Sequence, residues 1–364
     1  MVQQRKTKLF AWVVLLIGVA AIKILSFYPA WVEQYYARGV YPHISAAQRY
    51  LLGWLPISLG DVLYGAIIVW LVWQTVKVVK LMKRKVLYSH LALAFFRRII
   101  FAGLLIYLLF YGLWGLNYSR EGIAGQLGLR KMEYTVSDLD SLVSALHEKL
   151  NAHADLLTPA MRDSFKSKKN LFANAALLYQ VAEKQYPFLA YKGYSVKPSI
   201  FSYWGNFLGF QGYYNPFTGE AQVNTTIPHC SEPFVAAHEI AHQLGYAKES
   251  EANFVGFLAC RLHPSVNFKY SVYFDMYHYA VRELRYADSL KAKAYDNSLH
   301  LQVQKDIAEY RAFYKKYRNP IEPLIDKMYG YFLKANNQPK GKGSYSEVVN
   351  WLIAYYKKYG RNAI

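Results

Sequence analysis

Residues 233–245 read Pro-Phe-Val-Ala-Ala-His-Glu-Ile-Ala-His-Gln-Leu-Gly and contain the pattern His-Glu-x-x-His. Ser231 can cap a helix, the proline suits its first turn, and Gly245 suits the left-handed position after its end. The stretch therefore predicts one short helix. Residues four apart share a helix face, so His238 and His242 can hold one metal ion.

The glutamate between the two histidines has a different place. Glu239 lies one step off the shared face, which puts its carboxylate beside the ion and not on it. Zinc held by protein ligands keeps an open position for water and lowers the pKa of that water to about 7. Glu239 can then accept the proton as general base. Short motifs also occur by chance on helix surfaces, and the flanking residues decide between the two interpretations. They favour Zn²⁺ as cofactor, His238 and His242 as ligands and Glu239 as the catalytic residue.

A third protein ligand is expected on a second predicted helix, which covers residues 248–260 and carries two glutamates near its start. Glu249 and Asn253 share a face with small residues, and small residues let two helices approach closely. Glu251 lies on a bulkier face of the same helix. We therefore predict Glu249 as the third ligand and Glu251 as the alternative. Asn253, one turn after Glu249, is predicted to orient a ligand.

These residues support two resemblances. His238-Glu239-x-x-His242 with Glu249 and Asn253 resembles the gluzincin arrangement of zinc peptidases, in which a glutamate on a second helix completes the metal site. Over nearly its whole length, the chain also resembles a family of bacterial membrane proteins known as a domain of unknown function. The marks of that family are Ser58-Leu59-Gly60-Asp61, residues 212–221 and residues 238–253. The resemblances imply a zincin-like domain and peptidase activity.

Three apolar stretches in the first third of the chain are expected to cross a membrane as helices. They cover residues 9–27, 60–79 and 99–116. Each is about the length that crosses a hydrocarbon core about 30 Å thick. Residues 1–119 are therefore expected to form a membrane anchor, and residues 120–364 an extracytoplasmic domain. No small-x-small cleavage site follows the first stretch, which favours an uncleaved span over a signal peptide.

The net charge of +19 is unevenly distributed, because residues 1–119 hold 13 Lys and Arg but only 2 Asp and Glu. Most of these basic residues form two clusters, one before the first span and one between the second and third. The clusters are Arg5, Lys6 and Lys8, and Lys77, Lys80, Lys83, Arg84, Lys85, Arg97 and Arg98. The positive-inside rule makes both clusters cytoplasmic, so three spans place the domain in the periplasm of a bacterial cell. Because the clusters serve membrane topology, we expect a lipid bilayer as partner and no nucleic acid.

The domain is predicted to be mainly helical, except that Gly, Pro, Tyr and β-branched residues between 191 and 226 predict turns and short strands. Residues 219–224 alternate like a strand just before the predicted metal-binding helix. In zincin folds a strand at this place presents an open edge to an extended peptide. Gly219, Glu220 and Ala221 are therefore candidate substrate-binding residues, with an ordinary hairpin strand as the alternative. The expected fold is an α-rich α+β protein, with three N-terminal transmembrane helices before a mainly helical zincin-like domain with a small sheet.

Several other side chains have competing interpretations. Asp61 at the start of the second span is expected to be a helix cap, with a buried functional carboxylate as the alternative. Cys230 and Cys260 lack a metal-binding spacing, and two separate thiols are expected in preference to a disulfide. Candidates for an oxyanion-stabilising group, each more typical of a helical core, are Tyr277, His278 and Arg282.

Together these features predict a membrane-anchored, gluzincin-like zinc metallopeptidase that hydrolyses a peptide bond outside the inner membrane. The expected partner, besides the bilayer, is a peptide or protein substrate in the cell envelope. The alternatives are a non-catalytic envelope scaffold that keeps the zincin fold, and a zinc amidase acting on a cell-wall component. Glu239 favours an enzyme, because a scaffold needs no general base.

Overall fold

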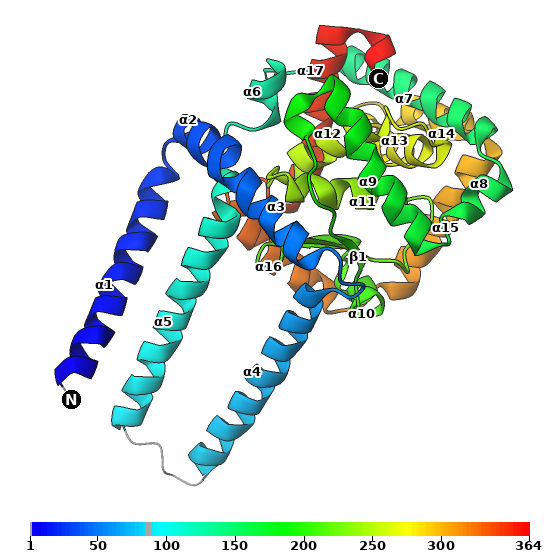
Figure 1. Cartoon of the computed structure of the whole chain (residues 1–364). Coiled ribbons are helices and arrows are strands. Elements are labelled where there is room, and N and C mark those ends of the chain that lie inside the picture. The colour runs from blue at the N-terminus through cyan, green and yellow to red at the C-terminus, as the bar shows by residue number, and fades with distance from the viewer. Residues whose placement is uncertain (1, 84–88, 131) are drawn as a thin grey trace.

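The computed structural model describes residues 2–83, 89–130 and 132–364. Three long helices, α1 (Val2–Leu25), α4 (Leu59–Lys83) and α5 (Ser89–Leu113), project from one side of a mainly helical body (Figure 1). Two members of the second basic cluster, Arg84 and Lys85, lie outside the described residues. The prediction of a mainly helical protein with a small sheet is confirmed.

Two helices are long and apolar enough to cross a membrane, over Leu59–Lys80 and Phe95–Leu113. A third crossing is found only if Leu9–Leu25 and Pro29–Leu52 count as one span, and these two segments are bent by 104°. The described residues therefore contain two such helices, or up to three, whereas the sequence predicts three. The difference lies in the first span, because the chain turns sharply soon after Leu25.

The chain between α1 and α4 folds onto the body. It forms α2 (Pro29–Trp31), the π-helix η1 (Val32–Val40) and α3 (Tyr41–Leu52), and after α5 come the 3₁₀-helix η2 (Gly115–Ser119) and α6 (Ile123–Leu127). Side chains from these segments and from the domain form one buried cluster. Its members are Val32, Tyr36, Tyr41, Trp114, Leu116, Tyr118, Tyr214 and Ala247. Residues on both sides of the predicted boundary after residue 119 belong to this cluster, so the anchor segments and the domain pack against each other.

The larger hydrophobic core lies among the helices of the body. These elements are α7 (Val136–Leu156), α8 (Pro159–Ser164), α9 (Lys168–Gln185), η3 (Pro187–Leu189), α10 (Ser202–Leu208), α11 (Glu232–Gln243), α12 (Glu249–Cys260), α13 (Val266–Ala287), α14 (Ser289–Asn297), α15 (Leu301–Tyr317), α16 (Glu322–Ala335), η4 (Gly341–Glu347), α17 (Val348–Tyr359) and η5 (Arg361–Ala363). Local sequence sets several of the boundaries. Helix α7, for example, begins after Thr135, whose side chain forms a capping box with Asp138.

The sheet has three short strands, β1 (Val196–Pro198), β2 (Gly212–Asn215) and β3 (Glu220–Val223), in the order β1-β3-β2. Strand β3 pairs in parallel with β1 and antiparallel with β2. The strand predicted at residues 219–224 is thus present, but it is central. The prediction that it presents an open edge is wrong, because both of its edges are occupied by neighbouring strands.

Candidate metal centre

The helix predicted from His-Glu-x-x-His is α11, and all of its residues are buried. Ser231 precedes it but makes no side-chain capping hydrogen bond. Instead, the amide of Phe234 donates to Oγ of Ser271 on α13, at 3.0 Å. A hydroxyl from another helix therefore satisfies a donor at the start of α11, which the local sequence alone could not reveal.

The other end of α11 is capped by residues from the predicted anchor. Trp114 Nε1 donates to the carbonyl of His242 at 2.9 Å, and the hydroxyl of Tyr41 donates to the carbonyl of Gln243 at 2.8 Å. Gly245 follows with φ of +85°, and a Cβ there would lie 2.8 Å from the ring of Tyr41. Only glycine combines that backbone conformation with this close approach. These segments of the predicted anchor thus hold α11 in place.

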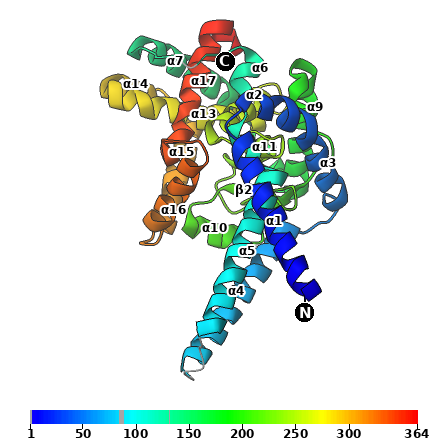
Figure 2. The same cartoon turned by 90° about the vertical axis from the view of Figure 1, so that its left-hand side faces the viewer.

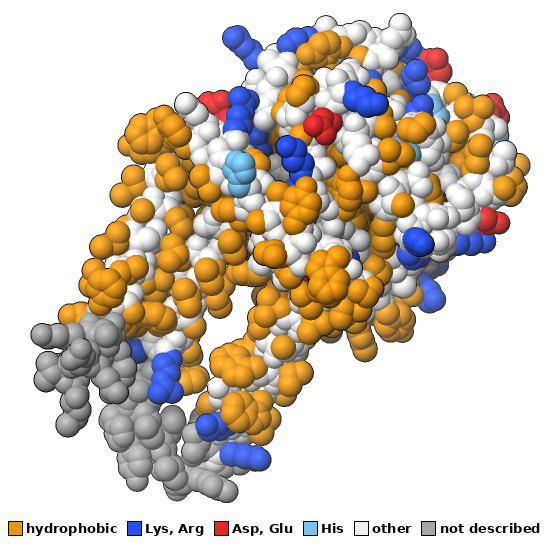
Figure 3. Space-filling view, in the orientation of Figure 1, with side chains coloured by type: hydrophobic (Ala, Val, Ile, Leu, Met, Phe, Trp, Pro, Cys, Tyr) orange, Lys and Arg blue, Asp and Glu red, His pale blue; other side chains and the backbone are white. Residues whose placement is uncertain are grey.

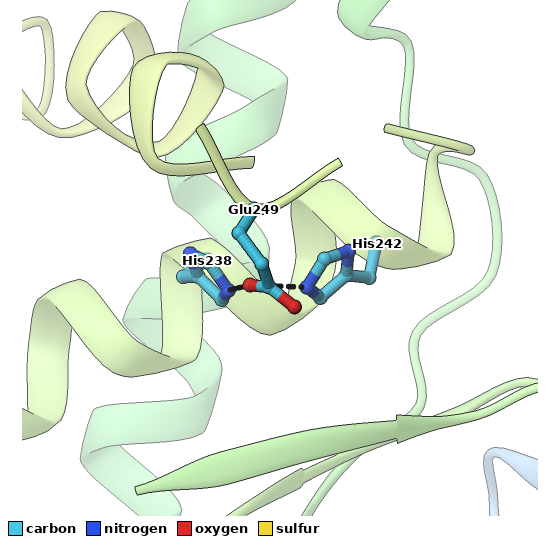
Figure 4. Close-up of side chains that lie close together, drawn as sticks. All are labelled: His238, His242 and Glu249. Atoms are coloured by element: carbon cyan, nitrogen blue, oxygen red, sulfur yellow. Dashed lines mark ion pairs between the residues drawn. The ribbon is translucent and has the colours of Figure 1, made fainter. Parts of the chain in front are cut away.

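His238, His242 and Glu249 meet in one cluster, and their ligand atoms all lie within 4.8 Å of one another (Figure 4). Oε2 of Glu249 is 3.2 Å from Nε2 of His238 and 3.5 Å from Nε2 of His242. A tetrahedral zinc ion with bonds of about 2.0–2.1 Å holds its ligand atoms about 3.4 Å apart. The donor set and its spacing therefore fit Zn²⁺.

Both imidazoles are held through their other nitrogen. Nδ1 of His242 lies 2.8 Å from the carbonyl oxygen of Tyr246, and Nδ1 of His238 lies 2.8 Å from Oδ1 of Asn253. A carbonyl oxygen can only accept, so in the neutral ring the proton of His242 sits on Nδ1. Nε2 then carries a lone pair toward the cluster, as a metal ligand requires.

Glu249 reaches the histidines because α12 packs closely on α11. At Gly256 an added Cβ would lie 3.0 Å from the ring of Phe234 and 3.6 Å from the backbone nitrogen of His238. Two residues from the C-terminal part of the chain then hold Glu249. The hydroxyl of Tyr329 donates to Oε1 of Glu249 at 2.7 Å. The backbone amide of Glu249 donates to Oε1 of Gln338 at 3.0 Å. Sequence reasoning missed both contacts, which join residues about 80 to 90 positions apart.

Glu251 points away from the cluster. Its carboxylate lies against Gly122, where an added Cβ would come within 2.3 Å of Oε1, and Nζ of Lys248 is 3.4 Å from Oε1. It is buried, with 3% of its surface exposed, so it is not a surface carboxylate. The structure therefore places Glu249, and not Glu251, against the two imidazoles.

Glu239 lies beside the cluster with its carboxylate buried. An added Cβ at Gly212, the first residue of β2, would lie 2.6 Å from its Oε1 and 2.9 Å from the carbonyl oxygen of Gln222, so a larger side chain would crowd this place. Its Oε2 has no hydrogen-bond partner among the described residues. Burial raises the pKa of Glu239 to about 7, against the opposing effect of the two histidines. This carboxylate has the environment of a general base that works near neutral pH.

The charges in the cluster depend on one another. Burial disfavours the charged forms of both His242 and Glu249. For His242, the nearby Glu249 carboxylate outweighs the effect of burial and raises the pKa of His242 to about 9. Conversely, His242 and His238 outweigh burial and hold the pKa of Glu249 well below its usual range. A cation bound by these groups would replace the proton on His242 and lower the pKa of Glu239 as well.

The residues predicted to bind substrate lie elsewhere. Glu220 is fully buried; its carboxylate accepts a hydrogen bond from Nζ of Lys197 at 2.5 Å and from the amide of Gly60 at 2.6 Å. Glu220 therefore caps the start of α4, while Ala221 is fully buried and Gly219 lies against Gln48. The prediction of a peptide-binding edge at Gly219, Glu220 and Ala221 is corrected, because β3 is the central strand.

Asp61 is also not a simple cap. Ser58 caps the start of α4 by accepting from the amide of Asp61, at 3.0 Å. The carboxylate of Asp61 accepts from the amide of Ile200 at 2.6 Å and from the hydroxyls of Ser199 and Tyr213. It thus fastens the first turn of α4 to the β1–α10 connection and to β2.

The contacts of the remaining candidates lie within the domain. Cys230 and Cys260 are separate buried thiols. The hydroxyl of Tyr277 donates to Asp296, and Arg282 donates to Ser346. The ring of His278 packs on Phe274 and Tyr310.

A paired substitution tests which glutamate belongs to the cluster. Glu249→Gln is expected to weaken zinc binding by more than the about 10–100-fold that loss of a supporting hydrogen bond costs, since it removes an anionic ligand. Glu251→Gln, a buried glutamate on the same helix, is the matched control and should leave the affinity within a few-fold of the original. Competition with a chromogenic chelator measures both. A larger loss in Glu251→Gln would contradict the arrangement.

Residues 36–353 match a family model whose description is "Protein of unknown function (DUF3810)". The match begins in η1 and ends in α17, so it includes α4, α5 and the candidate metal centre. No curated protein and no solved structure matches the chain.

Proposed function

Because the chain belongs to the DUF3810 family, whose description names no activity, its function has to come from the site, and we propose a membrane-anchored zinc-dependent peptidase. One observation carries the proposal. The buried carboxylate of Glu239, which can accept a proton, lies beside three metal-ligand atoms whose spacing fits zinc. A binding scaffold would need the three metal ligands at most. Such a role does not call for a buried carboxylate with an oxygen that lacks a hydrogen-bond partner among the described residues.

The chemistry divides between the ion and the chain. Zinc held by His238, His242 and Glu249 would supply a Lewis acid that acidifies water and polarises a carbonyl group. Glu239 accepts a proton from the attacking water and can return it to the leaving amine. Asn253 and the carbonyl of Tyr246 orient the two imidazoles, and Tyr329 holds the carboxylate of Glu249.

A peptide substrate is favoured by the strand next to Glu239. Strand β2 is at the edge of the sheet, and a Cβ added at its first residue, Gly212, would lie 2.6 Å from Oε1 of Glu239. An extended peptide can pair with such an edge through main-chain hydrogen bonds, which brings its backbone carbonyls past the site. This edge supports a peptide bond as the target in preference to an amide in a cell-wall component.

The proposal is tested on the full-length protein in detergent. Residues 120–364 alone would lack Tyr41 and Trp114, which cap α11. Metal analysis should find about one zinc per chain, and cleavage of a mixed peptide library should stop with a chelator and return with added zinc. Purified protein that holds no zinc, or whose cleavage is indifferent to the chelator, would contradict the proposal.

We further propose that the domain lies outside the cytoplasm, which the basic clusters support. A reporter active only outside the cytoplasm should work when fused after Ile364. The same reporter should fail at Tyr88, in the connection between α4 and α5 that lies outside the described residues. A cytoplasm-specific reporter at the two positions is the control and should give the opposite pattern. Activity at Tyr88 and none after Ile364 would place the domain in the cytoplasm.

A further inference from the structure

The underside of the domain, from which α4 and α5 project, carries two helices with exposed apolar side chains. In the two views α10 and α16 lie on this side, near the ends of α4 and α5 (Figure 1, Figure 2). Hydrophobic side chains also continue from α4 onto the adjoining part of the domain (Figure 3). On α10, Tyr203 and Trp204 are 55% and 64% exposed. At and just before α16 the exposed fractions are 58–61% for Ile321, Leu324, Met328 and Tyr331.

The exposed residues of α16 form one stripe. Leu324, Met328 and Tyr331 follow one another at spacings of four and three, which places them on a single helix face. Leu333, on the opposite face, is fully buried in the body. Lys327 and Lys334 flank the stripe on one side, as helical spacing requires. A helix with an apolar stripe and lysines beside it has the pattern of helices that lie in a membrane interface.

Phe332 of α16 and Phe201, the residue just before α10, lie close to the apolar segments α5 and α4. The ring of Phe332 in α16 packs edge-on against Phe110 in α5, with centroids 6.2 Å apart, and the hydroxyl of Tyr111 donates to Oδ1 of Asn336 at 2.6 Å. On the other side, a Cβ added at Gly65 in α4 would lie 3.7 Å from the ring of Phe201, just before α10. Phe110 and Gly65 both belong to the apolar segments that are fit to cross a membrane. The two helices are therefore tied to the spans at the depth where hydrocarbon meets headgroups.

We propose that α16 and α10 are seated in the bilayer that α4 and α5 cross, in the leaflet nearest the domain. The apolar stripe of α16 and the rings of Tyr203 and Trp204 lie at the boundary between acyl chains and headgroups, where tyrosine and tryptophan are enriched. The aliphatic parts of Lys327 and Lys334 lie along the apolar boundary, and their ammonium groups reach the lipid phosphates.

The seated helix is the one that reaches the candidate metal centre. Tyr329 lies on the inner side of α16 and donates to Glu249, while Met328, one residue earlier, lies on the exposed stripe. The bilayer contact and the contact to Glu249 are therefore made by opposite sides of one helix. The proposed position of α16 and α10 in the membrane is supported by their exposed apolar side chains, the helical spacing of these residues and the contacts with α4 and α5. It does not depend on whether the site binds zinc.

The test places an environment-sensitive fluorophore on the full-length protein at Met328→Cys, in nanodiscs that contain one copy each. The native thiols, Cys230 and Cys260, are buried, and the unsubstituted chain measures any background labelling. Leu290→Cys on α14 is the control, because Leu290 is 80% exposed and α14 lies away from the spans (Figure 2). The probe at 328 should lose emission with lipids that carry a quencher high on the acyl chain and should resist iodide. The probe at 290 should show the reverse.

Equal quenching by iodide at 328 and 290 would overturn the proposal. So would protection at 328 that appears only in nanodiscs with two copies, because the stripe would then be an interface between copies of this chain. Leu324→Cys, one turn earlier on the same face, repeats the measurement if Met328→Cys fails to fold. Helix content by circular dichroism identifies such a failure.

Discussion

Replacing His242 with alanine is expected to abolish stoichiometric zinc binding. Only His238 and Glu249 would remain, and two protein ligands hold the ion poorly. If the about 10–16 kcal/mol of a four-ligand zinc site is shared equally, one ligand accounts for about 3–4 kcal/mol, or about 10²–10³-fold in affinity. His238→Ala should behave in the same way, because its Nε2 lies at a similar distance from Glu249. Metal content per chain, measured after gel filtration of the full-length protein, checks both variants.

A control separates loss of the ligand from loss of the fold. His229 is outside the cluster, with its side chain 46% exposed, so His229→Ala should keep its zinc. His242→Ala also leaves the buried carboxylate of Glu249 with one imidazole instead of two, and its melting temperature is expected to fall. If His242→Ala is folded by circular dichroism and still holds one zinc per chain, the cluster is not the metal site.

Replacing Glu239 with glutamine is expected to leave zinc bound and the fold intact, but to lower hydrolysis by about 10²–10⁴-fold. Glutamine is nearly isosteric with glutamate but cannot accept a proton from water. Its size also matches the space beside Gly212, where the carboxylate already fits closely. Complementation of a deletion strain is the broader readout, because it does not require the natural substrate to be known.

Glu251→Gln is again the matched control, since it removes a buried carboxylate of the same kind away from the cluster. It should complement the deletion strain, whereas Glu239→Gln should not, at matched protein levels. Full complementation by Glu239→Gln would replace the peptidase by a binding protein that keeps the metal site. Loss of zinc in Glu239→Gln would instead show that this residue is a ligand or holds one.

The local parts of the candidate site follow from the sequence, because helical periodicity acts over a few residues. The positions of His238 and His242 one turn apart depend only on α11 being a helix. The choice of Glu249 over Glu251 depends on which face of α12 can approach α11, and the small residues on one face indicate it. The close contact at Gly256 is the physical expression of that pattern.

Other parts of the site depend on contacts between distant segments. Strand pairing is one example. Alternation in residues 219–224 predicts a strand, but it cannot tell whether that strand is central or at an edge. The structure places β3 between β1 and β2, so β2 and not β3 lies at an edge of the sheet. Glu220 of β3 is buried and caps the start of α4. Similarly, Tyr329 carries no local mark that would connect it with Glu249.

The sequence by itself determined the helix that carries His238, Glu239 and His242, and the mainly helical class. It also determined that the second and third apolar stretches are helices long and apolar enough to cross a membrane. These properties arise from composition and from spacings within one or two helical turns. Only the tertiary structure decided that Tyr41 and Trp114 cap α11, that Tyr329 holds Glu249, and that β2 is the strand beside Glu239. Each of these contacts joins residues more than 25 positions apart, and such contacts form through the packing of whole elements, which no local pattern encodes.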